Sequence, residues 1–208
     1  MARQSHDQRG EGYALGGLGS TQLSLEHIEE ALAHYQQALS IFQVIGHRQG
    51  EAYILESLGR AYFNAGKLEE ALTSSMQSLT LHTDIHNRRG EGHSAFNIAR
   101  IYRAKHELSV ALEYAERARQ SLVESRVPEG ATAQALVDVV KAALANDKSA
   151  EAQALLACAK NPANTGDLKE SIEFAHEAQS IAQAENLTNI ELAARVLIEE
   201  YDRKTTDG

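Results

Sequence analysis

Apolar residues recur along this chain with the spacing of helices that bury one face. Polar residues fill the positions between them, and the apolar pairs return at a constant interval. Residues three or four positions apart lie on the same side of an α-helix, whereas a half-buried strand would alternate at every second position. The recurring apolar positions are Leu15, Leu18, Leu55, Leu58, Ala95 and Ile98. They predict a series of amphipathic helices.

Four glycines mark the length of the repeating unit. Gly10, Gly50, Gly90 and Gly130 follow one another at intervals of 40 residues. In each of the first three units the sequence pattern predicts two helices with a short turn between them, as over 51–64 and 68–84 in the second unit. A period of this length is typical of stacked helix pairs. The chain is therefore expected to be all-α, an α-solenoid of about ten antiparallel helices.

Small residues also recur in register, at positions where two helix backbones would come close together. A methyl-sized side chain there lets the second helix of a pair pack into the groove of the first. Tyr62 and Tyr102 occupy a large position three residues after Gly59 and Ala99. The small residues are Gly19, Gly59 and Ala99, then Ala31, Ala71 and Ala111.

The order of a large apolar residue, Leu-Gly, Tyr and Ala in a helix-turn-helix resembles the tetratricopeptide repeat (TPR). The resemblance covers residues 10 to about 126, with departures at Ser75 and Ala115, where Tyr35 has the family's aromatic residue. The 40-residue period is similar to the long-helix type of kinesin light chains, spindle-orientation adaptors and bacterial transcriptional or peptide-sensing regulators. The resemblance implies a right-handed superhelix in one domain over 1–208. Its repeats would be 10–49, 50–89 and 90–129, followed by degenerate repeats and a capping helix over 130–204.

The repeat pattern weakens after Arg126. Asp138 stands where Leu58 and Ile98 are apolar, so the helix that begins near Gly130 is expected to rotate. It would then bury Leu136, Val139, Val140, Ala143 and Leu144. Further helices are expected over 148–160, 168–184 and 188–201, with a break over 161–165. Gly166-Asp167-Leu168 echoes Gly66-Lys67-Leu68, so 168–184 is expected to be the second helix of a pair, and the last helix to cap the stack with Ile190, Ala193, Ala194 and Ile198 inward.

Charge and composition narrow the classes of function. The formal charge is −9, and residues 127–208 hold 7 basic and 14 acidic side chains. A nucleic-acid binder would need a concentrated basic face, so no nucleic-acid partner is expected. A single cysteine, Cys158, and the lack of an apolar leader or a long apolar run favour a cytoplasmic protein with no membrane partner.

The resemblance also implies where a ligand binds. In this family the first helix of each pair lines a concave surface, and its outward side chains contact an extended or helical peptide. The matching positions here are Tyr13, Tyr53, Glu56, Arg60, Phe63, Asn64, His93, Phe96, Arg100 and Arg103. Arginines beside aromatic rings favour a partner that carries carboxylates. The alternative is that the arginines pair with neighbours such as Glu56 and Glu91 while the aromatic rings fill gaps between helices.

Other chemistry has weaker support. His82, His86 and His93 with Asp84 resemble a metal-ligand spacing, but His82 replaces Phe42 and Leu122 in the repeat and is more simply a core aromatic residue. Cys158 lies in an alanine-rich helix that would keep its thiol inert. No metal, cofactor or catalytic residue is therefore expected.

Two functions remain open from the sequence. The first is a non-catalytic protein–protein interaction module that binds a peptide or helix, with acidic groups favoured. The alternative is the sensory repeat portion of a bacterial signalling or transcription regulator that responds to a peptide or small molecule. The residues before Gly10 match the linker before Gly50, so the chain is expected to start at the end of a preceding unit. Its glycine-rich first helix would fray or pair with a second copy, giving a homodimer.

Overall fold

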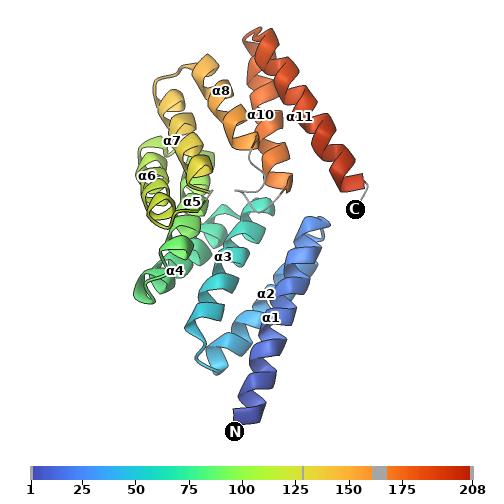
Figure 1. Ribbon diagram of the computed structural model, residues 1–208, viewed down its shortest axis with the longest axis vertical. Coiled ribbons are helices and arrows are strands. Elements are labelled where there is room, and N and C mark those ends of the chain that lie inside the picture. Colours follow the sequence, from blue (N-terminus) through green and yellow to red (C-terminus); the bar gives the residue numbers. More distant parts are fainter. Residues whose placement is uncertain (1, 128, 161–167, 207–208) are drawn as a thin grey trace. The chain divides into compact units, whose positions relative to one another are not determined.

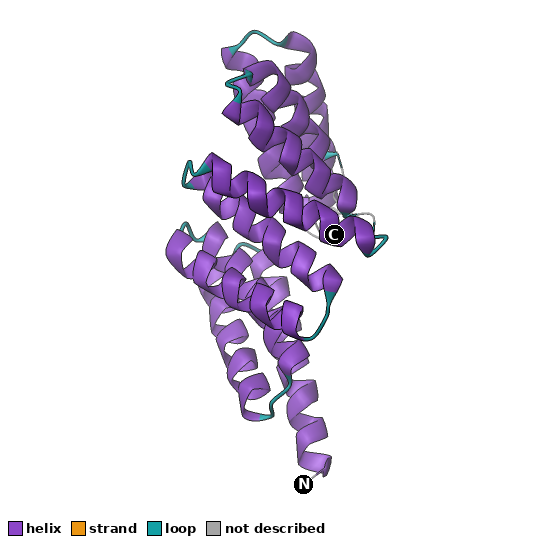
Figure 2. Ribbon diagram, turned by 90° about the vertical axis from the view of Figure 1, so that its left-hand side faces the viewer, coloured by secondary structure: helices purple, strands orange, loops and turns teal. Residues whose placement is uncertain are grey.

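The computed structural model of the chain describes residues 2–127, 129–160 and 168–206. Within these ranges it contains ten α-helices joined by short loops and no strand (Figure 1, Figure 2). The all-α fold class expected from the sequence is therefore confirmed. The chain divides into two compact units, Met1–His106 and Glu107–Gly208.

The first unit contains five helices. Each of them packs against the next, and α3 also contacts α1 and α5. The first helices of successive pairs therefore lie side by side. The helices are α1 (Ala2–Ser24), α2 (Ile28–Val44), α3 (Arg48–Asn64), α4 (Leu68–Asp84) and α5 (Arg88–Ala104).

A left-handed residue ends each helix of this unit and turns the chain into the next one. Gly46 (φ 67°) and Gly66 (φ 71°) fill this position after α2 and α3, and His86 (φ 55°) fills it after α4. The next residue then donates its N–H to a carbonyl five residues back, as from His47 to Phe42 at 2.9 Å. This hydrogen bond satisfies a carbonyl at the helix end. The turn predicted at Gly66 is confirmed.

The core of the first unit follows the repeat positions. Ala31 and Ala71 are fully buried, and Leu58 and Ile98 are 3% and 0% exposed. Leu18, at the same repeat position in α1, is 50% exposed. Its predicted core position is wrong because it lies on the side of α1 away from α2 and α3.

Three glycines of α1 permit close packing rather than only weakening the helix. A Cβ at Gly12 would lie 2.8 Å from the Phe42 ring, and one at Gly19 would lie 2.7 Å from the Tyr35 ring. A Cβ at Gly16 would meet Ile54 at 2.8 Å. Nothing lies within 4 Å of a Cβ at Gly10 or Gly17. The cost in helix propensity that the sequence predicts is thus offset at the first three positions by tight contact with large side chains.

The second unit also contains five described helices, each of which packs against the next. In addition α8 contacts α11. The assignment of 168–184 as the second helix of a pair stays a prediction. The helices are α6 (Leu108–Glu124), α7 (Gly130–Leu144), α8 (Lys148–Ala159), α10 (Leu168–Ala184) and α11 (Thr188–Thr206). The predicted break over 161–165 and the Gly166-Asp167 pair lie outside the described residues.

The rotation predicted for α7 is present, but Leu144 is exposed and Ala143 is only half-buried. Asp138 is exposed, and Leu136, Val139 and Val140 are fully buried. Leu144, which was expected in the core, is 45% exposed because it is the last residue of the helix. Ala133 is buried in the first turns of the helix.

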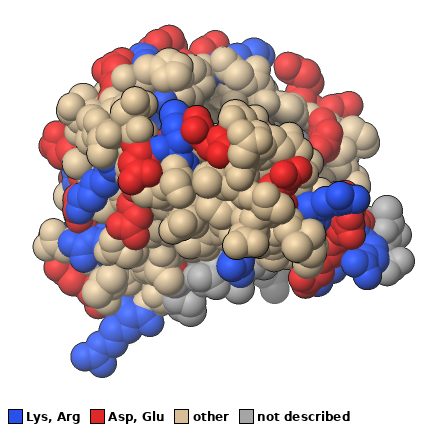
Figure 3. Space-filling view, turned by 90° about the horizontal axis from the view of Figure 1, so that it is seen from above, with Lys and Arg blue, Asp and Glu red and all other residues tan. Residues whose placement is uncertain are grey.

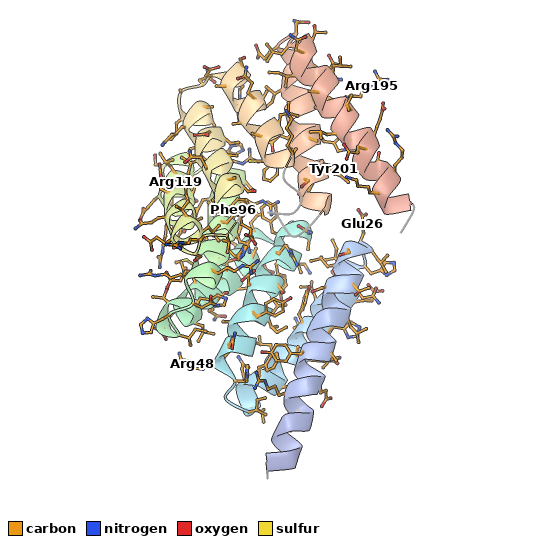
Figure 4. All side chains as sticks on the ribbon, viewed as in Figure 1. Glu26, Arg48, Phe96, Arg119, Arg195 and Tyr201 are labelled. Atoms are coloured by element: carbon orange, nitrogen blue, oxygen red, sulfur yellow. The ribbon has the colours of Figure 1, made fainter. Side chains whose placement is uncertain are left out.

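The C-terminal helix is attached to its unit by a buried tyrosine. Tyr201 is 2% exposed, and its hydroxyl donates a 2.8 Å hydrogen bond to the carbonyl of Ala159 in α8. Figure 4 labels this side chain on α11. Ala194 and Ile198 face inward as predicted, at 0% and 9% exposed, while Ile190 and Ala193 are only half-buried.

Candidate functional site

A pocket of about 520 Å³ opens in the first unit, where outward side chains of α1, α3 and α5 meet the end of α4. Tyr13 and Tyr53 are its large exposed residues, at 39% and 45%. We call it the Tyr53 pocket. Its lining residues are Tyr13, Gly17, Gln49, Tyr53, Glu56, His82, Asn87, Arg89, Gly90 and His93.

His82 is the most buried polar group of the Tyr53 pocket, at 2% exposed. Its orientation is set by Asn87, which caps α5. The Asn87 Oδ1 accepts a 3.1 Å hydrogen bond from the N–H of Gly90, so its Nδ2 is the atom that donates to His82 Nδ1 at 3.1 Å. In a neutral imidazole the proton is then on Nε2.

Glu56 of α3 faces this imidazole. Its Oε2 lies 3.5 Å from His82 Nε2, which is longer than a good hydrogen bond, and Nε2 has no hydrogen-bond partner among the described residues. The Glu56 side chain is 24% exposed. The pocket therefore contains a largely buried carboxylate and a buried N–H that are close to each other but not joined.

Gly90 allows the His82 ring to occupy its position. A Cβ on Gly90 would overlap that ring, just as a Cβ on Gly50 would lie 2.7 Å from the ring of Phe42 one repeat earlier. Two of the glycines that define the 40-residue period, Gly50 and Gly90, therefore lie where an aromatic side chain of the preceding helix packs against the next helix. The expectation that His82 is a buried aromatic residue is confirmed.

The outward positions nearer the C-terminal ends of α3 and α5 have a different arrangement. The guanidinium carbon of Arg100 lies 4.6 Å from the centroid of the Phe63 ring, a cation–π contact. Arg100 and Phe96 are each 7% exposed, so their predicted solvent-facing position is wrong (Phe96, Figure 4). Stacking on Phe63 removes the Arg100 guanidinium from solvent. Burial of the large apolar Phe96 ring stabilises the folded state.

The structure thus groups the predicted residues in two places. Tyr13, Tyr53, Glu56 and His93 line the Tyr53 pocket, while Phe63 and Arg100 form the stack. Arg60, Asn64 and Arg103 are half-buried and do not line the pocket. The sequence analysis did not predict Gln49, His82, Asn87 or Arg89 at this site. A polar His82 at the Phe42 position was the available signal for it.

Metal and membrane sites find no support in the described part of the chain. No group of three His, Cys, Asp or Glu side chains there could hold a metal ion. None of the helices searched there is both long and apolar enough to cross a bilayer. On the face drawn in Figure 3, basic side chains are interspersed with acidic ones.

Two family models describe parts of this chain, both as tetratricopeptide repeats. They match residues 13–43 and 50–122. A comparison with curated protein sequences gave no match.

Solved structures resemble most of this chain in fold. The apo form of RapI matches with a TM-score of 0.69 and 13% identity over 97% of this chain, which spans 66% of the RapI chain. The TPR-like repeats of a putative kinesin light chain of Podosopora anserina match with a TM-score of 0.58 and 16% identity, over 94% of this chain and 97% of that one. A single-residue variant of that protein also gives a TM-score of 0.58. At these identities the likeness concerns the fold.

Proposed function

Because the chain belongs to the tetratricopeptide repeat family, we propose that it is a non-catalytic protein–protein interaction module. It holds a peptide or helix of a partner protein against the outward side chains of α1, α3 and α5. The observation that carries this proposal is the Tyr53 pocket, where Tyr13, Tyr53, Glu56 and His93 converge from all three helices.

The pocket has the properties of a peptide-binding hot spot. Its volume of about 520 Å³ is sufficient for a side chain of a ligand. Partly exposed tyrosines give a large contact area at a small cost in conformational entropy. The Tyr13 ring is already held in place, since its centroid lies 5.0 Å from that of Phe42 and 5.8 Å from that of His47.

The arginines of the same helices favour acidic groups on the partner next to the pocket. Arg60 follows Glu56 by four residues, about 6 Å along the axis of α3, and Arg103 lies near the end of α5. An arginine fork binds a carboxylate with two hydrogen bonds. A bound segment would therefore place acidic residues toward the C-terminal ends of these helices.

A selection experiment tests this function. The full chain is immobilised and used to select peptides from a random display library, and selected peptides are measured by calorimetry. We expect Tyr53→Ala to weaken binding about tenfold or more, because truncating a central aromatic residue usually costs more than 1 kcal/mol. The matched control is Val44→Ala, since Val44 is 77% exposed on α2 and lies outside the pocket. A selection that yields no peptide, or binding that is equal in the folded Tyr53→Ala variant, would contradict the proposal.

A second candidate function is the sensory repeat portion of a bacterial signalling or transcription regulator. The observation behind it is that the chain is similar in fold to part of a longer chain, since it spans 66% of RapI. Such a portion would change conformation when its peptide or small molecule binds. Solution scattering of the full chain with and without saturating selected peptide tests this, and superimposable curves would argue against a sensor.

A further inference from the structure

The Tyr53 pocket contains an acidic group, Glu56, that has no basic partner in a good hydrogen bond among the described residues. The Glu56 side chain is about three-quarters buried, and the basic group within ion-pair distance among the described residues is His82, at 3.5 Å. Asn87 and Gly90 fix the imidazole, so it is not free to move closer. A desolvated carboxylate is stabilised by a cationic donor at hydrogen-bond distance. This position is therefore prepared for a positive group from a ligand.

The aromatic walls of the pocket suit the same kind of group. The faces of tyrosine rings attract cations, and Tyr13 and Tyr53 are 39% and 45% exposed. The chain already makes contacts between a cation and an aromatic ring in the first unit. The guanidinium carbon of Arg9 lies 5.8 Å from the Tyr13 centroid, and that of Arg100 lies 4.6 Å from the Phe63 centroid.

The pocket also has room for a long side chain. Gly17 and Gly90 contribute no side-chain atoms to its lining, and a Cβ on Gly17 would meet open space. Lysine and arginine bury their methylene stems along apolar surface while placing the charged head at a polar group. A stem between the tyrosine rings would direct its head group to Glu56.

From these observations we propose that the Tyr53 pocket binds a lysine or arginine side chain of the partner. Glu56 accepts hydrogen bonds from its ammonium or guanidinium group, and Tyr13 and Tyr53 enclose the stem. The proposal rests on the proposed peptide-binding function and adds the class of the anchoring residue. With the arginines farther along α3 and α5, it also fixes the direction of the bound segment, basic at the pocket and acidic beyond it.

Arg89 makes this proposal sharply testable. It lines the same pocket and is exposed, so its positive charge repels a bound cation. A variant that removes this charge is expected to strengthen the binding of a cation, whereas one that removes the charge of Glu56 is expected to weaken it. Unspecific damage to the pocket would weaken binding in both variants.

The experiment uses small probes with the full chain labelled with ¹⁵N. Nα-acetyl-lysine methylamide, whose side-chain ammonium group is free, and its arginine, norleucine and glutamate analogues are titrated. The amide signals of Tyr53 and Gly90 are followed. We expect saturable shifts with the lysine and arginine probes and at least about tenfold weaker binding of the neutral norleucine probe. Glu56→Gln should weaken the lysine probe at least about tenfold, and Arg89→Gln should strengthen it about threefold. Glu30→Gln, the same change at an exposed site on α2, should leave its affinity unchanged.

Clear outcomes would overturn the proposal. These are tighter binding of the glutamate probe, equal binding of the norleucine probe, or an unchanged affinity for lysine in Glu56→Gln. If the Glu56→Gln variant does not fold, the salt dependence of probe binding to the unsubstituted chain is measured in its place. Raising NaCl from about 50 mM to about 500 mM should weaken the lysine probe but not the norleucine probe, and equal salt dependence would overturn the proposal. Selected peptides that need Tyr53 but are not enriched in lysine or arginine would overturn this inference alone and leave the proposed function intact.

Discussion

Gly90 and Gly50 show how a single residue type can serve two packing partners at one repeat position. A Cβ on Gly50 would press on the ring of Phe42, and a Cβ on Gly90 would overlap the ring of His82. The absence of a side chain allows a ring from the preceding helix to lie directly against the next backbone. At the second site this brings a hydrogen-bonding ring to the wall of the Tyr53 pocket.

The glycines of α1 give a prediction at this scale. Gly19→Ala should lower the free energy of unfolding of the first unit by about 1–3 kcal/mol, because the new methyl group would lie 2.7 Å from the buried Tyr35 ring. Gly10→Ala in the same helix should instead raise it by up to about 1 kcal/mol, since nothing lies within 4 Å and alanine favours the helix. Urea denaturation measures both variants, and a stabilised Gly19→Ala variant would refute the packing argument.

At the scale of helices, capping and ion pairs join neighbouring elements. The N–H of Ala150 donates to Asp147 Oδ1 at the start of α8, as that of Gly90 donates to Asn87 at the start of α5. Between α6 and α7, hydrogen bonds from Lys141 and Arg119 hold the pKa of the Glu116 carboxyl below its usual range. Figure 4 labels Arg119 on α6. These contacts fix the starts of α5 and α8 and the register of α6 against α7.

Tyr201 supplies the prediction for these elements. Tyr201→Phe should reduce the stability of the second unit by about 1 kcal/mol, because it removes the hydrogen bond that joins α11 to the Ala159 carbonyl. Burial raises the pKa of the Tyr201 hydroxyl. Its neutral form therefore stabilises the fold below the ordinary pKa of about 10, and this contribution is lost as the pH rises beyond it. Unfolding measured from about pH 7 to about pH 11 should show the wild-type advantage shrink at the alkaline end, and a constant difference would contradict this assignment.

At the scale of the whole molecule, the chain combines two compact units with different sequence regularity. The three matching repeats begin in the first unit, and the degenerate repeats lie in the second. In repeat proteins each repeat contacts mainly the repeats next to it, so the free energy of unfolding is approximately a sum of local terms. A local defect should therefore have a local effect.

Hydrogen exchange tests this local behaviour in the full chain. Gly19→Ala should speed the exchange of amides in α1 and α2, because its steric conflict with Tyr35 lies between these two helices. Tyr201→Phe should speed exchange in α11 and α8 and leave α1 and α2 unchanged. Faster exchange throughout the chain in either variant would show that the molecule unfolds as one cooperative unit.

The candidate site was only partly predictable from the sequence. Tyr53 and Glu56 were recognisable because the resemblance to the tetratricopeptide repeat implies that side chains at their positions face a ligand. His82 and Asn87 were missed as pocket residues, since their positions in α4 and in the cap of α5 indicate core packing and capping. Arg100 was expected on the outward, ligand-contacting surface, but it is 7% exposed and its guanidinium stacks on the Phe63 ring.

The sequence by itself determined the helical class, the paired helices of the first two repeats and the turns between them. These features depend on local spacing, and the 40-residue period reports them directly. Only the tertiary structure decided that Glu56, His82 and Tyr53 share one pocket and that Leu18 and Leu144 are exposed. Such outcomes depend on which helix covers each face and on the space that glycines leave, and residues distant in the sequence set both.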